Sequence, residues 1–392
     1  MARLPFDRKR HIRYFAHSLR SLPSAYSNLD TNRLTLVHFS VQSLDLLGVL
    51  DDEDMLNILS IDKKAVVDWI YSLQVLPDAR GLWPDHVGFK GGTFLGGTGT
   101  QYRDAGERNV GDPKTVPYEG FAYDHGHIAM TYTALCSLVA LGDDLSRFHR
   151  RGVIAALRHL QRPDGSFQCI SVGSENDMRF LFCACAISYM LNDWSGVDTD
   201  AAANFIRSCR SYDGAISLIS GMEGHGGSTF CAISALTLMG RADEVLSEDG
   251  WREELVRWCT ARQVAGLQGR PNKAEDTCYS YWIGGALRLL GCDHLLDQNA
   301  LTDFVLSCQT DMGGFGKVRG AYPDLLHSFY SMAWLSLSSD GTPRAGEPDL
   351  PVQGGRGEEE AMSEGNRLQL NRLNCALGTR DVRMSILFDI ET

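Results

Sequence analysis

Four glycine-containing turns recur along the middle of the chain at a nearly constant spacing. Gly165, Gly214, Gly266 and Gly313 stand 49, 52 and 47 residues apart, and each follows a segment that ends in Gln or Arg. A period of this length is typical of helical arrays in which each repeat is a pair of helices. The sequence therefore predicts an all-α protein made of helical hairpins.

Long apolar segments follow these turns, and amphipathic segments precede them. A helix that is apolar on every side is expected to be buried, whereas a helix with one charged face suits an outer layer. The apolar segments are residues 127–142, 179–191, 228–240, 278–291 and 327–337, and two amphipathic ones are 152–161 and 200–209. Inner helices wrapped by outer ones form either an open solenoid or a closed α/α barrel (toroid), and the period does not choose between them.

Polar residues gather at the starts of the apolar segments. In a closed ring these starts would meet at one end of a central cavity, and we expect the active site there. The residues concerned are His127, Arg179, His225, Asp276, Cys278 and His327.

Three of these residues form a candidate metal site. Cys278 and His327 lie 49 residues apart, close to the repeat period, so they are expected to be neighbours in adjacent repeats. Together with Asp276 they offer oxygen, sulfur and nitrogen ligands, a set suited to Zn²⁺, and three protein ligands leave a fourth position open, as in catalytic zinc sites. The alternative is that Cys278 is one more buried cysteine and His327 a hydrogen-bonded core histidine.

A second group of residues is suited to binding an anion. His225, Arg270, Lys273 and Tyr279 supply an imidazole, a guanidinium, an ammonium and a phenol, which can bracket a diphosphate and stabilise charge as a phosphoester bond breaks. Taken singly, Arg270 and Lys273 are ordinary surface charges. The glycines at 226–227, taken singly, form a turn or a helix cap. No Gly-x-x-x-x-Gly-Lys-Ser/Thr pattern occurs, so this is not a phosphate loop of the nucleotide-binding type.

Length, charge and cysteine content limit the classes of protein to which this chain can belong. A chain of 392 residues with 44% hydrophobic residues suffices for two domains or one large closed repeat array. The formal charge of −12 argues against general nucleic-acid binding. There is no uninterrupted apolar run of about 18 residues, and the charged start lacks the apolar core of a signal peptide. Eleven cysteines without a Cys-x-x-Cys motif fit reduced thiols, so we expect a soluble cytoplasmic protein.

The chain resembles the β subunits of protein prenyltransferases in five motifs that extend over roughly residues 10 to 337. These motifs are GRPNKAEDTCYSYW, GSENDMRF, GHGGSTFCAISAL, YDHGHIAMTYTAL and PDLLHSFYSMAWLSL. Within the family, the similarity is greatest to the geranylgeranyltransferases of type I. The resemblance implies an α/α barrel, one Zn²⁺ per β subunit and a heterodimer with a helical-repeat α subunit.

The resemblance also implies roles for individual residues. The family's zinc ligands correspond to Asp276, Cys278 and His327, and its diphosphate-binding positions to His225, Arg270, Lys273, Tyr279 and Lys317. Those expected to act in catalysis are Asp276, Cys278, Tyr279, Lys317 and His327. The lipid channel and the surface around the acceptor's last residues correspond to Thr35, Phe39, His127, Ala129, Tyr132, Arg179, Phe180, Trp282 and Leu326. Without the resemblance, the aromatic residues among them would be ordinary core residues.

Two positions distinguish members of the family. Farnesyl-transferring relatives close the lipid pocket with a Trp where this chain has Thr35, and the smaller residue leaves room for a fourth isoprene unit. The same relatives bind Mg²⁺ through an Asp where this chain has Lys317, a fixed cation. The resemblance therefore implies a geranylgeranyl donor site that does not require Mg²⁺.

The implied reaction transfers a geranylgeranyl group from its diphosphate to the cysteine of a protein that ends in Cys-aliphatic-aliphatic-Leu, as Rho-type small GTPases do. A zinc ion would bind the acceptor sulfur and lower its pKa from about 8.5, so that thiolate is present at neutral pH. A hydrophobic pocket discriminates by only about 1–3 kcal/mol per methylene, so some use of farnesyl-type acceptors is expected.

Other functions compete with this one. The nearest is a β subunit that transfers farnesyl or that acts on Rab proteins. Terpene cyclases also form helical barrels with Gln- and Gly-containing turns, but the chain has no Asp-x-Asp-Asp motif to start a cyclisation. A non-enzymatic helical-repeat scaffold would have a packed interior and no metal.

The C-terminal part differs from the repeats. We expect a barrel domain over residues 1–337 and a flexible linker rich in Gly, Pro, Ser and Glu over 338–365. The tail, residues 366–392, has apolar residues that would allow it to pack on the barrel, with no role assigned.

Overall fold

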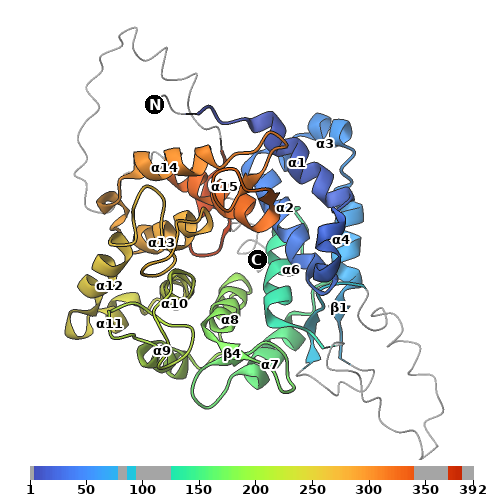
Figure 1. Ribbon diagram of the computed structural model, residues 1–392. Helices are drawn as coiled ribbons and strands as arrows, with labels where there is room; N and C mark the ends of the chain where they lie inside the picture. The colour runs from blue at the N-terminus through green and yellow to red at the C-terminus, as the bar shows by residue number, and fades with distance from the viewer. Residues whose placement is uncertain (1–3, 78–85, 94–124, 340–369, 382–392) are drawn as a thin grey trace, which may run out of the picture.

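Two layers of helices form a closed ring in the computed structural model (Figure 1). The structure describes residues 4–77, 86–93, 125–339 and 370–381. The inner layer of this described part consists of α2 (Arg33–Leu46), α6 (Ile128–Ala140), α8 (Met178–Met190), α10 (Gly226–Leu238), α13 (Cys278–Leu289) and α15 (Leu325–Ser339). Each inner helix contacts the next, and α15 contacts α2. The ring is therefore closed, which confirms the α/α barrel and excludes the open solenoid.

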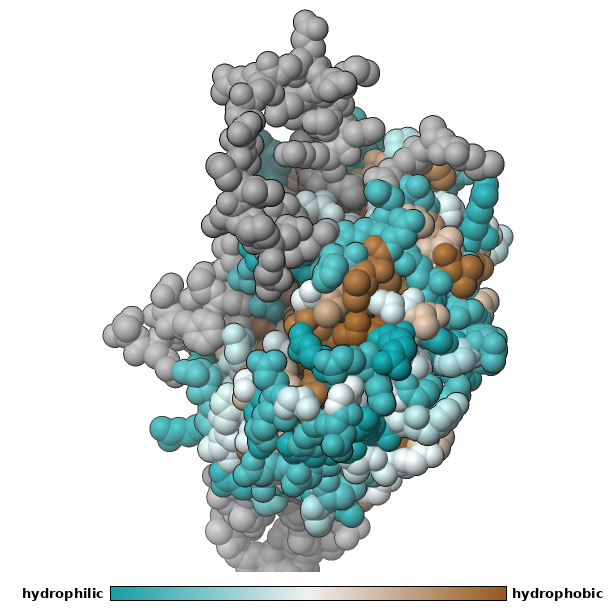
Figure 2. All heavy atoms as spheres, turned by 90° about the vertical axis from the view of Figure 1, so that its left-hand side faces the viewer, coloured by the Kyte–Doolittle hydropathy of each residue, from teal (hydrophilic) through white to brown (hydrophobic). Residues whose placement is uncertain are grey.

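The outer layer contains the helices that precede the inner ones along the chain. They are α1 (Arg8–Arg20), α4 (Lys63–Ser72), α7 (Arg150–Leu160), α9 (Thr199–Ser208), α12 (Trp251–Thr260) and α14 (Gln298–Ser307). Seen from the side of α11 and α12, the surface is mostly hydrophilic, with a limited apolar area near its centre (Figure 2). This distribution matches the amphipathic outer layer that the sequence predicts.

Short elements complete the description. Two further α-helices are α3 (Glu53–Leu59) and α11 (Ala242–Leu246), and the 3-10 helices are η1 (Ser24–Asn32), η2 (Val49–Asp51), η6 (Glu248–Gly250) and η7 (Asp293–Leu295). The strands form two-residue antiparallel pairs: β1 (Gln74–Val75) with β2 (Gly88–Phe89), β3 (Phe167–Gln168) with β4 (Asn176–Asp177), β5 (Phe315–Gly316) with β6 (Pro323–Asp324), and β7 (Leu373–Asn374) with β8 (Thr379–Arg380). The strands β4 and β6 lead directly into the inner helices α8 and α15.

A glutamine at the end of an outer helix repeatedly binds the start of the next outer helix. The side chain of Gln161 donates to the carbonyl of Asp198 at 2.9 Å and accepts from its N–H at 2.7 Å, and Gln263 makes the same pair of bonds with Asp297. Asp198 and Asp297 are themselves the N-caps of α9 and α14. The glutamine thus fixes the position of each following helix, which explains the Gln at the end of the repeated segments.

The last of these bonds closes the ring. Gln309, which follows α14, accepts from the N–H of Asp7 at 3.0 Å, and Asp7 caps α1 at the other end of the chain. The ring of His11 lies beside this contact, with Nε2 3.0 Å from Oε1 of Gln309 and Nδ1 accepting from the N–H of Gly314 at 3.0 Å. The first and last repeats are therefore joined in the same way as their neighbours.

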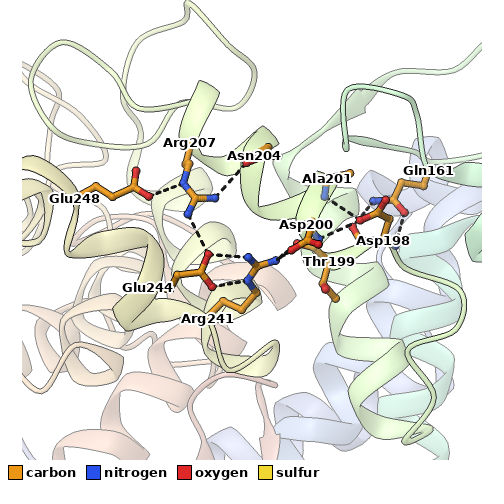
Figure 3. A network of polar contacts seen from close by, with 10 residues as sticks. All are labelled: Gln161, Asp198, Thr199, Asp200, Ala201, Asn204, Arg207, Arg241, Glu244 and Glu248. Atoms are coloured by element: carbon orange, nitrogen blue, oxygen red, sulfur yellow. Dashed lines mark hydrogen bonds and ion pairs between the residues drawn. The ribbon is translucent and has the colours of Figure 1, made fainter.

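Ion pairs also connect neighbouring repeats on the outer surface (Figure 3). Arg207 on α9 binds Glu248 at 2.8 Å and Glu244 on α11 at 3.2 Å, and Arg241 binds Glu244 at 2.7 Å and Asp200 at 2.5 Å. Exposed pairs of this kind each contribute only about 0–1 kcal/mol. The stability of the ring therefore comes mainly from its buried inner helices.

The inner helices are buried along most of their length. The segments predicted from residues 127–142, 179–191, 228–240, 278–291 and 327–337 correspond to α6, α8, α10, α13 and α15. Their residues form one continuous hydrophobic core. All eleven cysteines are free thiols, as expected. No helix in the described ranges combines the length and apolar character needed to cross a bilayer.

Part of the C-terminal tail packs on the ring. The hairpin of β7 and β8 contacts the barrel, and Leu373, Leu377 and Thr379 are buried. Residues 340–365 of the expected linker, together with 366–369 and 382–392 of the tail, lie outside the described residues.

Candidate metal and anion-binding site

Asp276, Cys278 and His327 converge at one end of the ring. One potential ligand atom from each residue lies within 4.8 Å of the other two. Asp276 and Cys278 are buried, and the side chain of His327 is 16% exposed. Among the described residues, this is the group of His, Cys, Asp and Glu side chains that is arranged to hold a metal ion.

Helix starts position the three side chains. Cys278 begins α13 and donates its backbone N–H to Oδ1 of Asp276 at 3.0 Å. His327 lies in the first turn of α15, the next inner helix. The hydroxyl of Thr277 donates to the carbonyl of Gly316 at 3.0 Å, and its N–H donates to the carbonyl of Lys317 at 3.0 Å. These bonds hold the loop before α13 against the loop before α15.

Asp324 completes the surroundings of His327. Its Oδ2 lies 2.6 Å from Nδ1 of His327, while Nε2 of His327 lies 3.2 Å from Oδ1 of Asp276. Metal-binding histidines usually donate the nitrogen that does not bind the metal to a carboxylate or carbonyl. The orientation of His327 therefore leaves Nε2 directed at the proposed ligand cluster.

The electrostatics of the cluster favour a bound cation. Burial alone would raise the pKa of Asp276, but hydrogen bonds from His327 and Cys278 lower it below its ordinary value. Burial lowers the pKa of His327, yet the hydrogen bonds to Asp276 and Asp324 outweigh it and raise that pKa to about 9. Burial and the nearby Asp276 carboxylate raise the pKa of the Cys278 thiol. A proton on His327 thus provides positive charge between the carboxylates of Asp276 and Asp324. A metal cation would take the place of this proton's charge and would also stabilise the Cys278 thiolate.

Lys317 lies next to Asp276, Cys278 and His327, which we call the metal-ligand cluster. Its Nζ is 3.5 Å from Oδ2 of Asp276, and its side chain is 61% exposed. The ammonium group therefore reaches the edge of the cluster while remaining open to an anionic ligand.

His225 and Tyr279 lie beside the same site and contact each other. His225 caps α10 by accepting the N–H of Gly227 at its Nδ1, 3.0 Å away. The proton of the neutral ring is then on Nε2, which lies 3.0 Å from the hydroxyl of Tyr279. Burial and the charge of Arg270 lower the pKa of His225, so the ring is neutral near pH 7. Two groups that can donate hydrogen bonds are thus held together at the start of α10.

The loop that carries Arg270 and Lys273 is fixed to this helix start. The N–H of Gly226 donates to the carbonyl of Gly269 at 2.8 Å, and a Cβ at position 269 would lie only 2.1 Å from Cζ of Tyr279. A glycine is therefore required there for Tyr279 to pack on the loop. Arg270 forms an ion pair with Glu223 at 2.8 Å, and Lys273 is exposed on the same loop.

Several predicted lipid-pocket residues form a band of aromatic rings inside the barrel. Phe39 stacks on Phe329 at 5.4 Å, and the ring of Trp282 lies 5.0 Å from that of Tyr330. Tyr132, Trp282 and Tyr330 are partly exposed although their helix neighbours are buried. Their exposed surface is therefore expected to line a space inside the ring.

The other predicted pocket residues lie nearer the helix starts. His127 caps α6, and its ring makes an edge contact with Phe180 at 5.8 Å. Ala129 is half-buried in the first turn of α6, and Leu326 is exposed in the first turn of α15. Thr35 directs its hydroxyl at the sulfur of Met130, 3.4 Å away.

Arg179 is held by two carboxylates. It binds Asp177, the N-cap of α8, at 2.6 Å and Glu175 at 3.0 Å, and its guanidinium lies 5.1 Å from the centre of the Phe180 ring. The structure therefore places the predicted residues in three groups: the metal-ligand cluster with Lys317, the His225–Tyr279 pair beside the 269–273 loop, and the aromatic interior with its rim.

Asp177, Glu223 and Asp324 contact predicted site residues but were not predicted themselves. Asp177 and Asp324 lie two and three residues before a predicted site residue, next to the start of an apolar helix. An acidic residue there is a typical N-cap signal, which would have found both.

Comparisons with known proteins agree with the fold. Residues 6–377 match the prenyltransferase alpha-alpha toroid domain. A geranylgeranyl transferase type-1 subunit beta from Arabidopsis thaliana is 40% identical over 88% of this chain and 89% of its own length. The subunit of the same name from Dictyostelium discoideum is 36% identical over 83% and 89%.

A solved structure shows the same fold. The Candida albicans protein geranylgeranyltransferase-I complexed with GGPP superposes with a TM-score of 0.74 at 21% identity, over 99% of this chain and 100% of that one. The chain therefore belongs to the prenyltransferase family with the alpha-alpha toroid domain, among the β subunits of type-1 geranylgeranyl transferases.

Proposed function

We propose that this chain is the catalytic subunit of an enzyme that transfers geranylgeranyl from geranylgeranyl diphosphate to the cysteine of proteins ending in Cys-aliphatic-aliphatic-Leu. Rho-type small GTPases belong to this class of acceptor. The observation that carries the proposal is the convergence of Asp276, Cys278 and His327 within 4.8 Å beside a group of cationic and hydrogen-bonding side chains. The partner is a prenyltransferase α subunit.

The donor set fits Zn²⁺. A carboxylate oxygen of Asp276, the sulfur of Cys278 and Nε2 of His327 would hold the ion, with Asp324 orienting the imidazole. Bound zinc supplies a Lewis acid that keeps the acceptor cysteine as thiolate near neutral pH. Mg²⁺ is not required in this proposal, because Lys317 already provides positive charge 3.5 Å from Asp276.

The remaining residues bind the lipid diphosphate. In the reaction the acceptor sulfur forms a bond to C1 of the lipid, the bond between C1 and the phosphate oxygen breaks, and diphosphate leaves with the electron pair. His225, Tyr279, Arg270, Lys273 and Lys317 would donate hydrogen bonds and positive charge to the leaving group. Since His225 is neutral and carries its proton on Nε2, it acts here as a donor.

Apolar walls would hold the lipid. The aromatic residues Phe39, Tyr132, Phe180 and Trp282 supply large apolar surfaces, and Thr35, Ala129 and Leu326 would contact the lipid or the end of the acceptor. Arg179 and His127 lie at the rim, where the acceptor peptide would enter.

The test is a transfer assay on the chain co-expressed with a prenyltransferase α subunit. Geranylgeranyl and farnesyl diphosphates are compared with peptides ending in Leu or Ser, with and without Mg²⁺. We expect the longer lipid and the Leu peptide to be preferred without Mg²⁺. Mg²⁺-dependent farnesyl transfer would instead support a farnesyltransferase, and no transfer would support a scaffold.

Cys278→Ala provides the second arm of the test. This variant should lose bound zinc and transfer activity while retaining binding of geranylgeranyl diphosphate. Cys292→Ala is the matched control, because Cys292 is a free thiol just beyond the opposite end of the same helix. Full turnover by Cys278→Ala would refute the ligand assignment.

A further inference from the structure

A tyrosine from the first repeat binds the start of the last inner helix. The hydroxyl of Tyr26, in η1, accepts the backbone N–H of Leu325 at 3.1 Å. Leu325 is the first residue of α15 and follows Asp324, whose carboxylate accepts the N–H of His327 at 2.9 Å. The first N–H groups of a helix have no partner within the helix and need an acceptor from outside it. Two of these groups in α15 are therefore bound, one by Asp324 and one by Tyr26.

This contact crosses the junction at which the ring closes. Tyr26 and Leu325 are 299 positions apart in the sequence. Tyr26 lies in the connection between α1 and α2, and α15 packs against α2 as the last member of the inner layer (Figure 1). Leu325 stands two residues before His327. A bond that joins the first repeat to the last therefore ends beside the metal-ligand cluster.

Tyr14 on α1 extends this contact. Its hydroxyl interacts with the hydroxyls of Tyr26 and of Ser328, the residue after His327. Burial raises the pKa of both phenols, and the charge of the nearby Asp324 carboxylate adds to the shift. Both tyrosines therefore keep their protons at neutral pH. Neutral hydroxyl groups from α1 and η1 thus surround the first turn of α15.

Two glycines make room for Tyr14. Gly313 and Gly314 have φ values of +81° and +73°, in the region that favours glycine. A Cβ at position 314 would lie 2.8 Å from Cε1 of Tyr14 and 2.8 Å from Oγ of Ser328. Any side chain there would separate Tyr14 from Ser328. The close approach of α1 to the start of α15 therefore depends on glycine at this position.

The bond from Leu325 to Tyr26 acts on Asp324 through the backbone. The N–H of Leu325 belongs to the planar peptide unit that also contains the carbonyl of Asp324, so fixing this N–H fixes the whole unit. The position of that unit determines where the Asp324 side chain begins. Its Oδ2 lies 2.6 Å from Nδ1 of His327 and orients the imidazole. A displaced peptide unit would therefore turn the histidine away from the metal-ligand cluster.

We propose that Tyr26 is a positioning residue of the metal site: its hydroxyl fixes the peptide unit between Asp324 and Leu325, and through Asp324 it sets the orientation of the His327 imidazole. This inference rests on the proposed function, because it takes His327 as a ligand of the metal ion. The candidate ligands lie at the starts of α13 and α15. The first repeat thus contributes to a metal site whose ligands come from two later repeats.

The first experiment uses the αβ enzyme with Tyr26→Phe, which keeps the ring and removes only the hydroxyl. Competition with a chelator should show zinc binding weakened by about tenfold, as for other residues that orient a metal ligand. Co²⁺ in place of zinc reports the ligand geometry, and its visible absorption should change in the variant. If Tyr26 served only the stability of the fold, the variant would unfold at a lower temperature with zinc affinity and Co²⁺ spectrum unchanged.

Tyr71→Phe is the matched control. The hydroxyl of Tyr71, on the outer helix α4, donates to Asp143 at 2.5 Å, beyond the C-terminal end of α6. This variant also loses one tyrosine hydrogen bond, but at a position far along the chain and the fold from the helix starts that carry the ligands. Its zinc affinity should stay within twofold of wild type.

A second measurement needs no variant and decides the question if Tyr26→Phe does not fold. If the bond between Leu325 and Tyr26 favours zinc binding, zinc must favour that bond by the same factor. Hydrogen exchange of the Leu325 amide in the wild-type αβ enzyme should therefore slow by about tenfold when zinc is added. Exchange at Leu325 that zinc leaves unchanged would overturn the inference.

The outcomes separate this inference from the proposed function. A wild-type enzyme that binds no zinc defeats the proposed function and the inference together. Zinc bound by wild type and equally well by folded Tyr26→Phe, with the same Co²⁺ spectrum, defeats the role of Tyr26 alone.

Discussion

Asp324 contacts His327 at two points: one carboxylate oxygen accepts the backbone N–H of His327 at 2.9 Å, and the other lies 2.6 Å from its ring Nδ1. The first contact begins the helix, and the second sets the orientation of the imidazole. A single residue therefore couples the start of α15 to the geometry of the proposed metal site.

Asp324→Asn should weaken zinc binding by about 10–100-fold, because the amide is a poorer acceptor for the Nδ1 proton and orients the ring less firmly. Competition with a zinc chelator measures the change. Asp311→Asn is the control, since Asp311 is fully exposed and forms a surface ion pair with Arg10. Equal zinc affinity in Asp324→Asn and wild type would show that Asp324 serves only as a helix cap.

Lys317→Asp should make transfer depend on Mg²⁺. The substitution exchanges an ammonium near Asp276 for a carboxylate, which would repel the diphosphate unless a divalent cation lies between them. Without Mg²⁺ we expect kcat/KM to fall about 10–100-fold, which is the effect of losing one hydrogen bond to a charged group. Added Mg²⁺ should restore part of the lost kcat/KM. Lys317→Ala serves as the control, because it removes the charge without creating a Mg²⁺ ligand. An unchanged metal profile in Lys317→Asp would contradict the proposed role.

Thr35→Trp should shift the donor preference toward farnesyl diphosphate. Thr35 lies against Met130 of the next inner helix, so an indole there would need more room than the threonine occupies beside α6. We expect the ratio of kcat/KM for geranylgeranyl over farnesyl diphosphate to fall by at least about tenfold. Thr35→Ser keeps the hydroxyl and should leave the ratio unchanged. If Thr35→Trp also leaves it unchanged, Thr35 does not limit the pocket.

The inner helices were predictable because their apolar residues and turn glycines are local features of the sequence. The same period also placed Cys278 beside His327, since equivalent positions of neighbouring repeats meet in any stacked array. Closure of the ring was not predictable from the residues alone. It depends on contacts such as that between Gln309 and Asp7, which are separated by 302 positions and carry no local signal.

The hairpin's place inside the ring was also beyond local patterns. The apolar residues of the tail indicated that it would pack on the barrel, but its position depends on Arg380 meeting Asp45, a pairing of residues 335 positions apart. The hydroxyls of Tyr132 and Tyr281 donate to backbone carbonyls in the turn of this hairpin. Such contacts likewise leave no pattern in the sequence, since any residue supplies a carbonyl.

His11 provides a test of ring closure by pH. The imidazole is almost completely buried, stacks on Phe315 at 4.5 Å and uses Nδ1 as an acceptor for Gly314. Burial lowers its pKa from 6.5 to about 4, although the hydrogen bond to Gln309 opposes the shift. Between these pH values the unfolded chain binds a proton that the folded chain does not, so stability falls as pH decreases.

The contribution of His11 to this loss should be about 3 kcal/mol between pH 7 and pH 4, at 1.36 kcal/mol per pKa unit. Burial also lowers the pKa of His38 to about 3 and of His127 to about 4, so wild type should lose more than this in total. His11→Phe keeps a ring for stacking but cannot titrate, and urea unfolding at several pH values should show a shallower decline than in wild type. His17→Phe, at an exposed position of the same helix, should leave the decline unchanged. If His11→Phe declines as steeply as wild type, His11 is not held neutral at the junction that closes the ring.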